Sequence, residues 1–175
     1  LRAAKVRVRH MRYLFFLAGW LASLATSAQS AETPEINQHV WKPFIETFNQ
    51  YRSDDFLALH SRDLIRSARD SKRVLNWQQY LDETKTGEAN DKKEGFKRTL
   101  ELRFTERLHS TTQAIDVGIY KTVYTFSNGT TQAFYGRFHV ALRKEKGRWK
   151  ILVDTDSSEN GTIGEKDFYQ AKPME

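Results

Sequence analysis

The stretch that decides the fold is residues 135–158, which read YGRFHVALRKEKGRWKILVDTDSS. Apolar and polar residues alternate on both sides of a Lys-Glu-Lys-Gly turn, a pattern that predicts two antiparallel strands joined by a tight turn. The stretch also carries four side chains that a hairpin does not need in order to fold: Arg137, His139, Asp154 and Asp156. They belong either to a working site or to the polar side of a sheet.

The alternation continues upstream and predicts a long antiparallel meander. The four strand candidates are Thr99–His109, Gln113–Ser127, Thr130–Lys144 and Arg148–Asp156. Asn128-Gly129, between the second and third strands, is a strong signal for a two-residue hairpin turn. We therefore expect these strands to form one sheet in sequence order.

Helical periodicity precedes the meander. Apolar residues from Ile36 to Tyr51 recur on one helical stripe, although Pro43 inside it predicts a kink or a late start. Ser53 begins a second short helix, and Asn76 caps a third, which we expect to run from Trp77 to about Lys85. Two short strands between them turn near residues 69–72. Helices gathered on one side of an antiparallel meander predict an α+β domain.

Two segments carry a resemblance to a known family. FIETFNQYRSDDFLALHSRDLIRS (44–67) and GRFHVALRKEKGRWKILVDTDSS (136–158) resemble the opening and the closing hairpin of SnoaL-like domains of the NTF2-like superfamily. The resemblance implies a cystatin-like cone, in which a curved antiparallel sheet wraps a long N-terminal helix and leaves a pocket at the wide end. The superfamily includes isomerases, cyclases, dehydratases, binding modules and assembly domains. Many relatives end the last strand with His, where this chain has Thr155.

The first 30 residues have the pattern of an export signal. Five basic residues precede an apolar core, YLFFLAGWLASLA, and small residues follow it. An uncleaved anchor is the alternative, but a membrane-spanning helix needs about 20 apolar residues. We expect a signal peptide with a charged lead-in (1–30), an NTF2-like domain (31–158) and a polar C-terminal tail (159–175). This predicts a bacterial periplasmic or secreted protein, with no stable membrane insertion after cleavage.

Charge argues against a nucleic-acid partner. The formal charge of +6 comes from 28 basic and 22 acidic residues, and five of the basic residues lie in the expected leader, which has no acid. The remaining chain has 23 basic and 22 acidic residues, so it lacks the basic excess of a nucleic-acid-binding surface. The chain has no cysteine, and therefore no disulfide framework or cysteine nucleophile.

The turn positions predict which side chains share a face of the sheet. A two-residue turn at Asn128-Gly129 pairs Val123 with Phe134 and Ile119 with Phe138, and it places Ile115 and Val117 on the core side; a separate turn at residues 144–147 adds Val153 to that side. The opposite face then carries a set of polar and aromatic residues: Arg103, Tyr120, Tyr135, Arg137, His139 and Asp154. Opposite charges across neighbouring strands of that face predict two ion pairs, Arg137–Asp154 and Arg107–Asp116. Such a set forms a substrate-anchoring patch, a solvated face or a dimer surface. Its Tyr and Arg content favours a homodimer interface.

Polar residues that interrupt the predicted core face are candidate pocket groups. Glu106 and Lys121 are the candidate acid–base residues, because a buried charge must be paired or change its pKa. The predicted ligand-binding set is Glu106, Lys121, Thr155, Trp41 and Tyr80. The alternative for the two charged residues is that a β-bulge turns them to the rim. Trp41 and Tyr80 also suit plain core positions.

No pattern in the sequence indicates a cofactor. The histidines are scattered without metal-ligand spacing, and no glycine-rich phosphate loop is present, so we expect neither a metal nor an organic cofactor. Three functions remain open. The first is a non-catalytic module that binds a small, partly apolar ligand in the cone. The second is an isomerase, cyclase or dehydratase that uses acid–base residues there, and the third is a pure dimerisation or interaction module.

Overall fold

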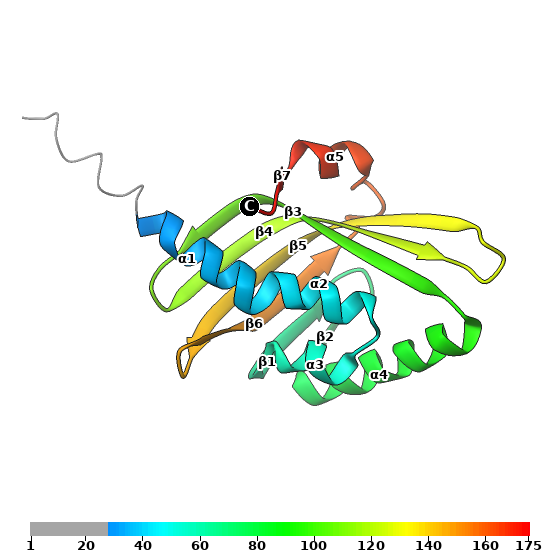
Figure 1. Ribbon diagram of the computed structural model, residues 1–175, viewed down its shortest axis with the longest axis horizontal. Helices are drawn as coiled ribbons and strands as arrows, with labels where there is room; N and C mark the ends of the chain where they lie inside the picture. Colours follow the sequence, from blue (N-terminus) through cyan, green and yellow to red (C-terminus); the bar gives the residue numbers. More distant parts are fainter. Residues whose placement is uncertain (1–27) are drawn as a thin grey trace, which may run out of the picture.

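A curved seven-stranded sheet, crossed on one face by a long helix, forms the body of the protein (Figure 1). The computed structural model describes residues 28–175, so nearly all of the expected export signal lies outside the described residues. Within them, no helix is long and apolar enough to span a membrane. The face of the sheet toward the N-terminal helix is called the inner face below, and the opposite face the outer face. The expected α+β cone is confirmed.

The N-terminal helix is interrupted in its middle. It consists of α1 (Ala28–Ile36), a π-helical turn (Asn37–Trp41) and α2 (Lys42–Asn49). Pro43 lies in the first turn of α2 and has no N–H to bond a carbonyl of the π-helical turn that precedes it. The expected irregularity at this proline is therefore a wide turn just before it. Ile36 and Val40 are fully buried, as their helical spacing predicts.

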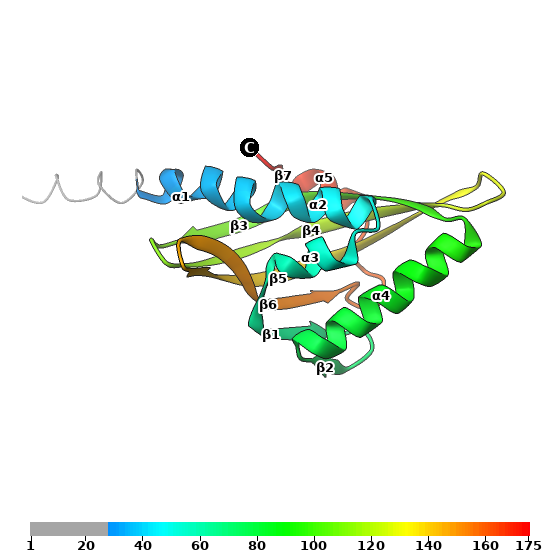
Figure 2. The same ribbon diagram turned by 60° about the horizontal axis from the view of Figure 1, so that its bottom comes forward.

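Two helices cover the other end of the inner face (Figure 2). They are α3 (Ser53–Ala58) and α4 (Trp77–Glu94). Asn76 caps α4 as predicted: its side chain accepts a hydrogen bond from the Gln79 N–H at 2.9 Å, and the Gln79 side chain accepts one from the Asn76 N–H. The helix continues nine residues beyond its expected end to Glu94, and Gly95, with a φ of +70°, closes it. Glu88 ties this polar extension to α3 by accepting a hydrogen bond from the Ser53 N–H.

The strands follow the predicted meander. They are β1 (His60–Ala68), β2 (Arg73–Leu75), β3 (Lys97–His109), β4 (Gln113–Thr125), β5 (Thr131–Glu145) and β6 (Arg148–Ser157). With β7 (Lys172–Pro173) at one edge, the sheet order is β2-β1-β6-β5-β4-β3-β7, and β1 runs parallel to β6. The four long strands lie within two residues of their predicted bounds, so the alternation of the sequence located them correctly.

The predicted register between β4 and β5 is wrong by one residue. The hairpin has a three-residue loop, Ser127–Gly129, closed by Gly129 at φ +83°, in place of a two-residue turn. Val123 therefore pairs with Ala133, and Ile119 with Arg137. Because side chains alternate along a strand, this shift moves the whole predicted core set of β4 to the outer face.

Two β-bulges change the faces further. One lies in β6 between Ile151 and Val153, so Val153 turns outward and Asp154 turns inward. The other lies in β3 between Phe104 and Glu106, beyond which Leu108 is 47% exposed. Phe104 and Ile151, which precede the bulges, are buried on the inner face.

The C-terminal segment packs against the outer face. Residues 159–175, expected as a polar tail, contain α5 (Glu165–Gln170) and β7 (Lys172–Pro173), and β7 pairs with β3. Phe168 is 1% exposed and packs with Ile119 in a second core cluster. The apolar outer side of β4 is therefore partly covered by the chain itself.

Candidate functional site

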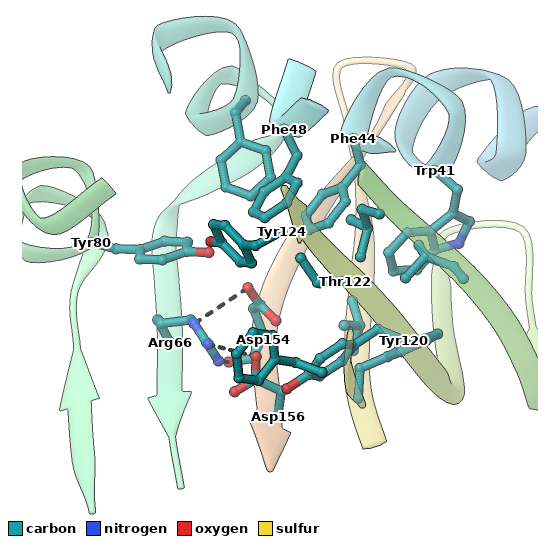
Figure 3. A pocket seen from close by; sticks show the side chains of 16 residues that line it. Trp41, Phe44, Phe48, Arg66, Tyr80, Tyr120, Thr122, Tyr124, Asp154 and Asp156 are labelled. Carbon is teal, nitrogen blue, oxygen red and sulfur yellow. Dashed lines mark hydrogen bonds and ion pairs between the residues drawn. The ribbon is translucent and has the colours of Figure 1, made fainter. Parts of the chain in front are cut away.

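The inner face holds a cavity of about 390 Å³ between the helices and the sheet. Aromatic rings form most of its wall: Trp41, Phe44, Phe48, Phe56, Tyr80, Tyr120, Tyr124, Phe134 and Phe138. Figure 3 shows these rings around the space, with Asp154, Asp156 and Arg66 gathered at one side of it. A small volume, apolar walls and a few convergent polar groups are the usual features of a small-molecule site.

The polar side of the cavity is organised by Arg66 of β1. Its Nη2 donates to Asp156 Oδ2 at 2.8 Å, and its Nε lies 3.6 Å from Asp154 Oδ2. Arg66 comes from the strand parallel to β6, which pairs it directly with Asp154. The ion-pair network therefore depends on contact between segments about 90 residues apart in the chain.

A buried histidine lies behind Asp154. His60 Nδ1 donates to the Phe56 carbonyl at 3.0 Å, which leaves Nε2 as the remaining ring nitrogen. That nitrogen is 3.8 Å from Asp154 Oδ2 and has no hydrogen-bond partner among residues 28–175. The His60 side chain is fully buried, so it supports Asp154 from behind and does not reach the cavity.

The two carboxyl groups of β6 have opposite pKa shifts. Burial would raise the pKa of Asp154, but the charge of Arg66 and the interaction with His60 outweigh it and hold this pKa below its ordinary value. Burial raises the pKa of Asp156, and the charge of Arg66 offsets this only in part. Asp154 is therefore held as a carboxylate, while Asp156 is the group that takes up a proton more readily.

Two tyrosine hydroxyls stay protonated beside these groups. Burial raises the pKa of Tyr120 to about 12, and the negative charge of Asp156 adds to the effect. Burial also raises the pKa of Tyr80, with Asp154 as the next contributor. Tyr120 lies across Gly136 of the neighbouring strand, where a Cβ would come within 2.5 Å of its hydroxyl oxygen. The absence of a side chain at residue 136 therefore lets the Tyr120 ring pack directly on the backbone of β5.

The cavity contains two of the five predicted ligand-binding residues. Trp41 and Tyr80 line it. The placement of the other three is wrong, because they lie on the outer face. Glu106 is exposed beyond the β3 bulge, Lys121 pairs with Glu101 at 3.6 Å, and Thr155 pairs with His139 across the outer side of β6. The register shift and the two bulges account for all three.

The predicted interface set is divided between two places. Tyr120 and Asp154 line the cavity, which corrects their placement on the outer face. Three members contact the C-terminal segment instead: Arg103 donates to the Ala171 carbonyl, Tyr135 packs on Phe168, and Arg137 pairs with Glu159 at 2.9 Å. The expected pair of Arg137 with Asp154 is not formed. His139 remains exposed on the outer face, and dimerisation through this face stays a prediction.

The predicted ligand-binding set did not include Arg66, Asp156 or His60. A signal for Arg66 was present, because it stands two residues after the buried Leu64 in a strand and so shares the inner face. No local pattern reveals Asp156, because its direction depends on the bulge in β6. Among residues 28–175, no group of three His, Cys, Asp or Glu side chains could hold a metal ion.

A second buried charge lies at the other end of the inner face. Asp116 is fully buried and accepts hydrogen bonds from Trp41 Nε1 at 2.7 Å, from Arg107 Nε at 3.1 Å and Nη2 at 3.0 Å, and from His109 Nε2 at 2.7 Å. The predicted Arg107–Asp116 pair is confirmed, although it lies under the N-terminal helix and not on the outer face. Thr33 of α1 contacts His109 Nδ1 at 3.1 Å, so the cluster anchors this helix to the sheet.

Comparison with solved structures identifies the fold. An NTF-2-like protein of unknown function from Shewanella oneidensis MR-1 superposes with a TM-score of 0.58 at 22% identity, covering 72% of this chain and 98% of that one. A candidate scytalone dehydratase from Novosphingobium aromaticivorans gives a TM-score of 0.63 at 14% identity, with 75% and 86% covered. A ketosteroid isomerase-like protein from Erwinia carotovora atroseptica gives 0.57 at 14% identity, with 73% and 96% covered. No family model and no curated protein sequence matches the chain.

Proposed function

We propose that this chain, which has the NTF2-like fold, binds a small, partly apolar molecule inside its cone. The observation that carries the proposal is the cavity of about 390 Å³, whose aromatic wall ends in one group of polar side chains. Phe134, which is 44% exposed, lies at the wall and keeps apolar surface accessible from solvent. A cone without such a cavity would favour the pure interaction module.

Filling the cavity is expected to abolish binding of an aromatic probe. Thr122 is 7% exposed and lines the space, so Thr122→Phe adds a ring where a ligand would lie. We expect the Kd for N-phenyl-1-naphthylamine, an uncharged fluorophore at pH 7, to rise at least about tenfold. Fluorescence titration measures it.

The matched control is Thr125→Phe. Thr125 belongs to the same strand but points to the outer face, so the probe is expected to bind this variant as it binds the wild type. Equal affinity of the wild type and Thr122→Phe, or no binding to the wild type, would contradict a ligand site in the cone.

A second candidate function is proton transfer in the same cavity. The opposite pKa shifts of Asp154 and Asp156 favour it, because such pairs provide one fixed charge and one group that exchanges protons. Asp156 would act as the base toward a substrate proton, and the protonated hydroxyl of Tyr120 lies beside it to stabilise a developing oxyanion. Glu106 and Lys121 have no part in this chemistry.

Deuterium exchange tests the second candidate. Cyclohexanone, 1-indanone and 1-tetralone are incubated in D₂O, and mass spectrometry measures incorporation next to the carbonyl. The wild type should accelerate deuterium incorporation relative to protein-free solution. In Asp156→Ala this rate enhancement should fall at least about a hundredfold. It should persist in Lys121→Met, because Lys121 lies on the outer face. Absence of any enhancement, or its survival in Asp156→Ala, would leave binding as the only supported function.

A further inference from the structure

The guanidinium group of Arg66 is held mainly by groups of the protein itself. Its Nη1 donates to the carbonyls of Ser67 at 3.0 Å and Asp154 at 3.2 Å, and its Nη2 donates to Asp156 Oδ2. Its Nε faces Asp154 Oδ2, and the Tyr80 hydroxyl is a further hydrogen-bond partner. The positive charge of Arg66 is balanced by the two carboxylates, and both Nη1 hydrogens and one Nη2 hydrogen are already used within the protein. Arg66 therefore organises the carboxyl groups and is unsuited to capture a carboxylate or phosphate.

Asp156 retains an acceptor that the protein leaves available. Arg66 binds only its Oδ2, and no residue in the range 28–175 donates a hydrogen bond to Oδ1. The Asp156 side chain is 34% exposed and lines the cavity, whereas that of Asp154 is 10% exposed. The strongest unused group of the site is thus one carboxylate oxygen of a partly exposed side chain that lines the cavity.

The charged and aromatic residues that line the cavity favour a positively charged ligand group. The charged residues that line the cavity are two carboxylates and one guanidinium, so the site has a net negative charge when both acids are ionised. The rings around it present π faces, which attract cations. A cation that meets Asp156 Oδ1 would be held by a charge-assisted hydrogen bond, while its apolar part contacts the aromatic wall.

We infer that the ligand of the cone is a small organic amine, whose protonated ammonium group binds Asp156 Oδ1 and whose apolar part packs on the rings. This inference rests on the proposed ligand-binding function and specifies the chemical class of the ligand. A neutral hydroxyl donor fits the same oxygen but gains nothing from the net charge. The amine is therefore favoured over the alcohol of the same skeleton.

Three probes with one carbon skeleton test the inference. Calorimetric titration at pH 7 compares 4-phenylbutylamine, 4-phenyl-1-butanol and 4-phenylbutyrate, which end in a cation, a neutral donor and an anion. We expect the amine to bind at least about tenfold more tightly than the alcohol, and the carboxylate to bind most weakly. In Asp156→Asn the amine should lose this advantage over the alcohol. In Asp63→Asn, which removes an exposed carboxylate outside the cavity, the advantage should remain.

The outcomes separate this inference from the proposed function. If the alcohol or the carboxylate binds the wild type as tightly as the amine, the amine inference is overturned and the binding function stands. If none of the three probes nor the uncharged fluorophore binds, both fail. Should Asp156→Asn not fold, the order of the three wild-type affinities still decides, because only a negative site ranks the amine first and the carboxylate last.

Discussion

Replacing Asp116 by alanine is expected to lower the free energy of unfolding by about 3–5 kcal/mol. The carboxylate is fully buried and accepts hydrogen bonds from Trp41, Arg107 and His109. Its removal leaves the indole N–H and the histidine without an acceptor, and it deprives a guanidinium group of its counter-charge. Buried donors without partners cost far more than the pair contributes when intact. The N-terminal helix loses its polar anchor at the same time.

Urea denaturation followed by tryptophan fluorescence measures the loss, because Trp41 reports directly on the cluster. The control is Asp63→Ala. The Asp63 side chain is 72% exposed, and its carboxylate lies 2.7 Å from Arg143. Exposed ion pairs contribute about 0–1 kcal/mol, so this variant should remain close to the wild type. Similar losses for the two variants would show that the Asp116 cluster is not the buried anchor described above.

Arg66→Met is expected to lower the free energy of unfolding at pH 7 by about 3–5 kcal/mol. Methionine approximates the length of the aliphatic stem but removes the charge that holds Asp154 and Asp156. Asp154 then remains buried beside the ring of His60, without its guanidinium partner. An uncompensated buried carboxylate is the costly outcome of breaking such a pair.

The loss should depend on pH in a defined direction. In the wild type the pKa of Asp154 lies below its ordinary value of 3.8, so its stabilisation is present above that pH and is lost as pH falls through the folded-state pKa. Without Arg66, burial places the pKa above the unfolded-state value, so the ionised group destabilises the fold at neutral pH. Protonation removes this penalty on acidification. The difference between the two proteins should therefore be largest near pH 7 and shrink toward pH 4.

Chemical denaturation at several pH values measures this difference. Arg69→Met is the matched control, because Arg69 is exposed just beyond the end of the same strand, and its backbone N–H, rather than its guanidinium group, contacts Asp156. We expect it to follow the wild type at every pH. A difference between Arg66→Met and the wild type that grows on acidification would contradict the assigned charge state of Asp154.

Local patterns were sufficient for the elements of the fold. Alternation located all four long strands, and Asn76 marked the start of α4, because both signals depend only on neighbouring residues. The end of α4 was missed because its polar second half has no apolar stripe and is held by contacts such as that between Glu88 and Ser53. Periodicity cannot report a helix that is stabilised in this way.

The candidate site was harder to predict, because it depends on which face each side chain occupies. One extra loop residue before Gly129 reversed β4, which brought Tyr120 into the cavity and sent Lys121 out. One bulge in β6 brought Asp154 and Asp156 inward. β4 and β6 have apolar residues on both faces. On β4, for example, Ile119 of the outer face is buried against Phe168 of α5. Hydrophobicity alone therefore could not choose between the two registers.

The sequence by itself determined the α+β class, the order of the elements and the aromatic content of the N-terminal helix, because periods of 2 and 3.6 are written in neighbouring residues. Only the tertiary structure decided that Arg66 meets Asp154 and Asp156, and that Trp41 meets Asp116. These contacts join segments about 75–90 residues apart. They exist because loop lengths and bulges set the register, and a shift of one residue along a strand exchanges the inside of the cone with the outside.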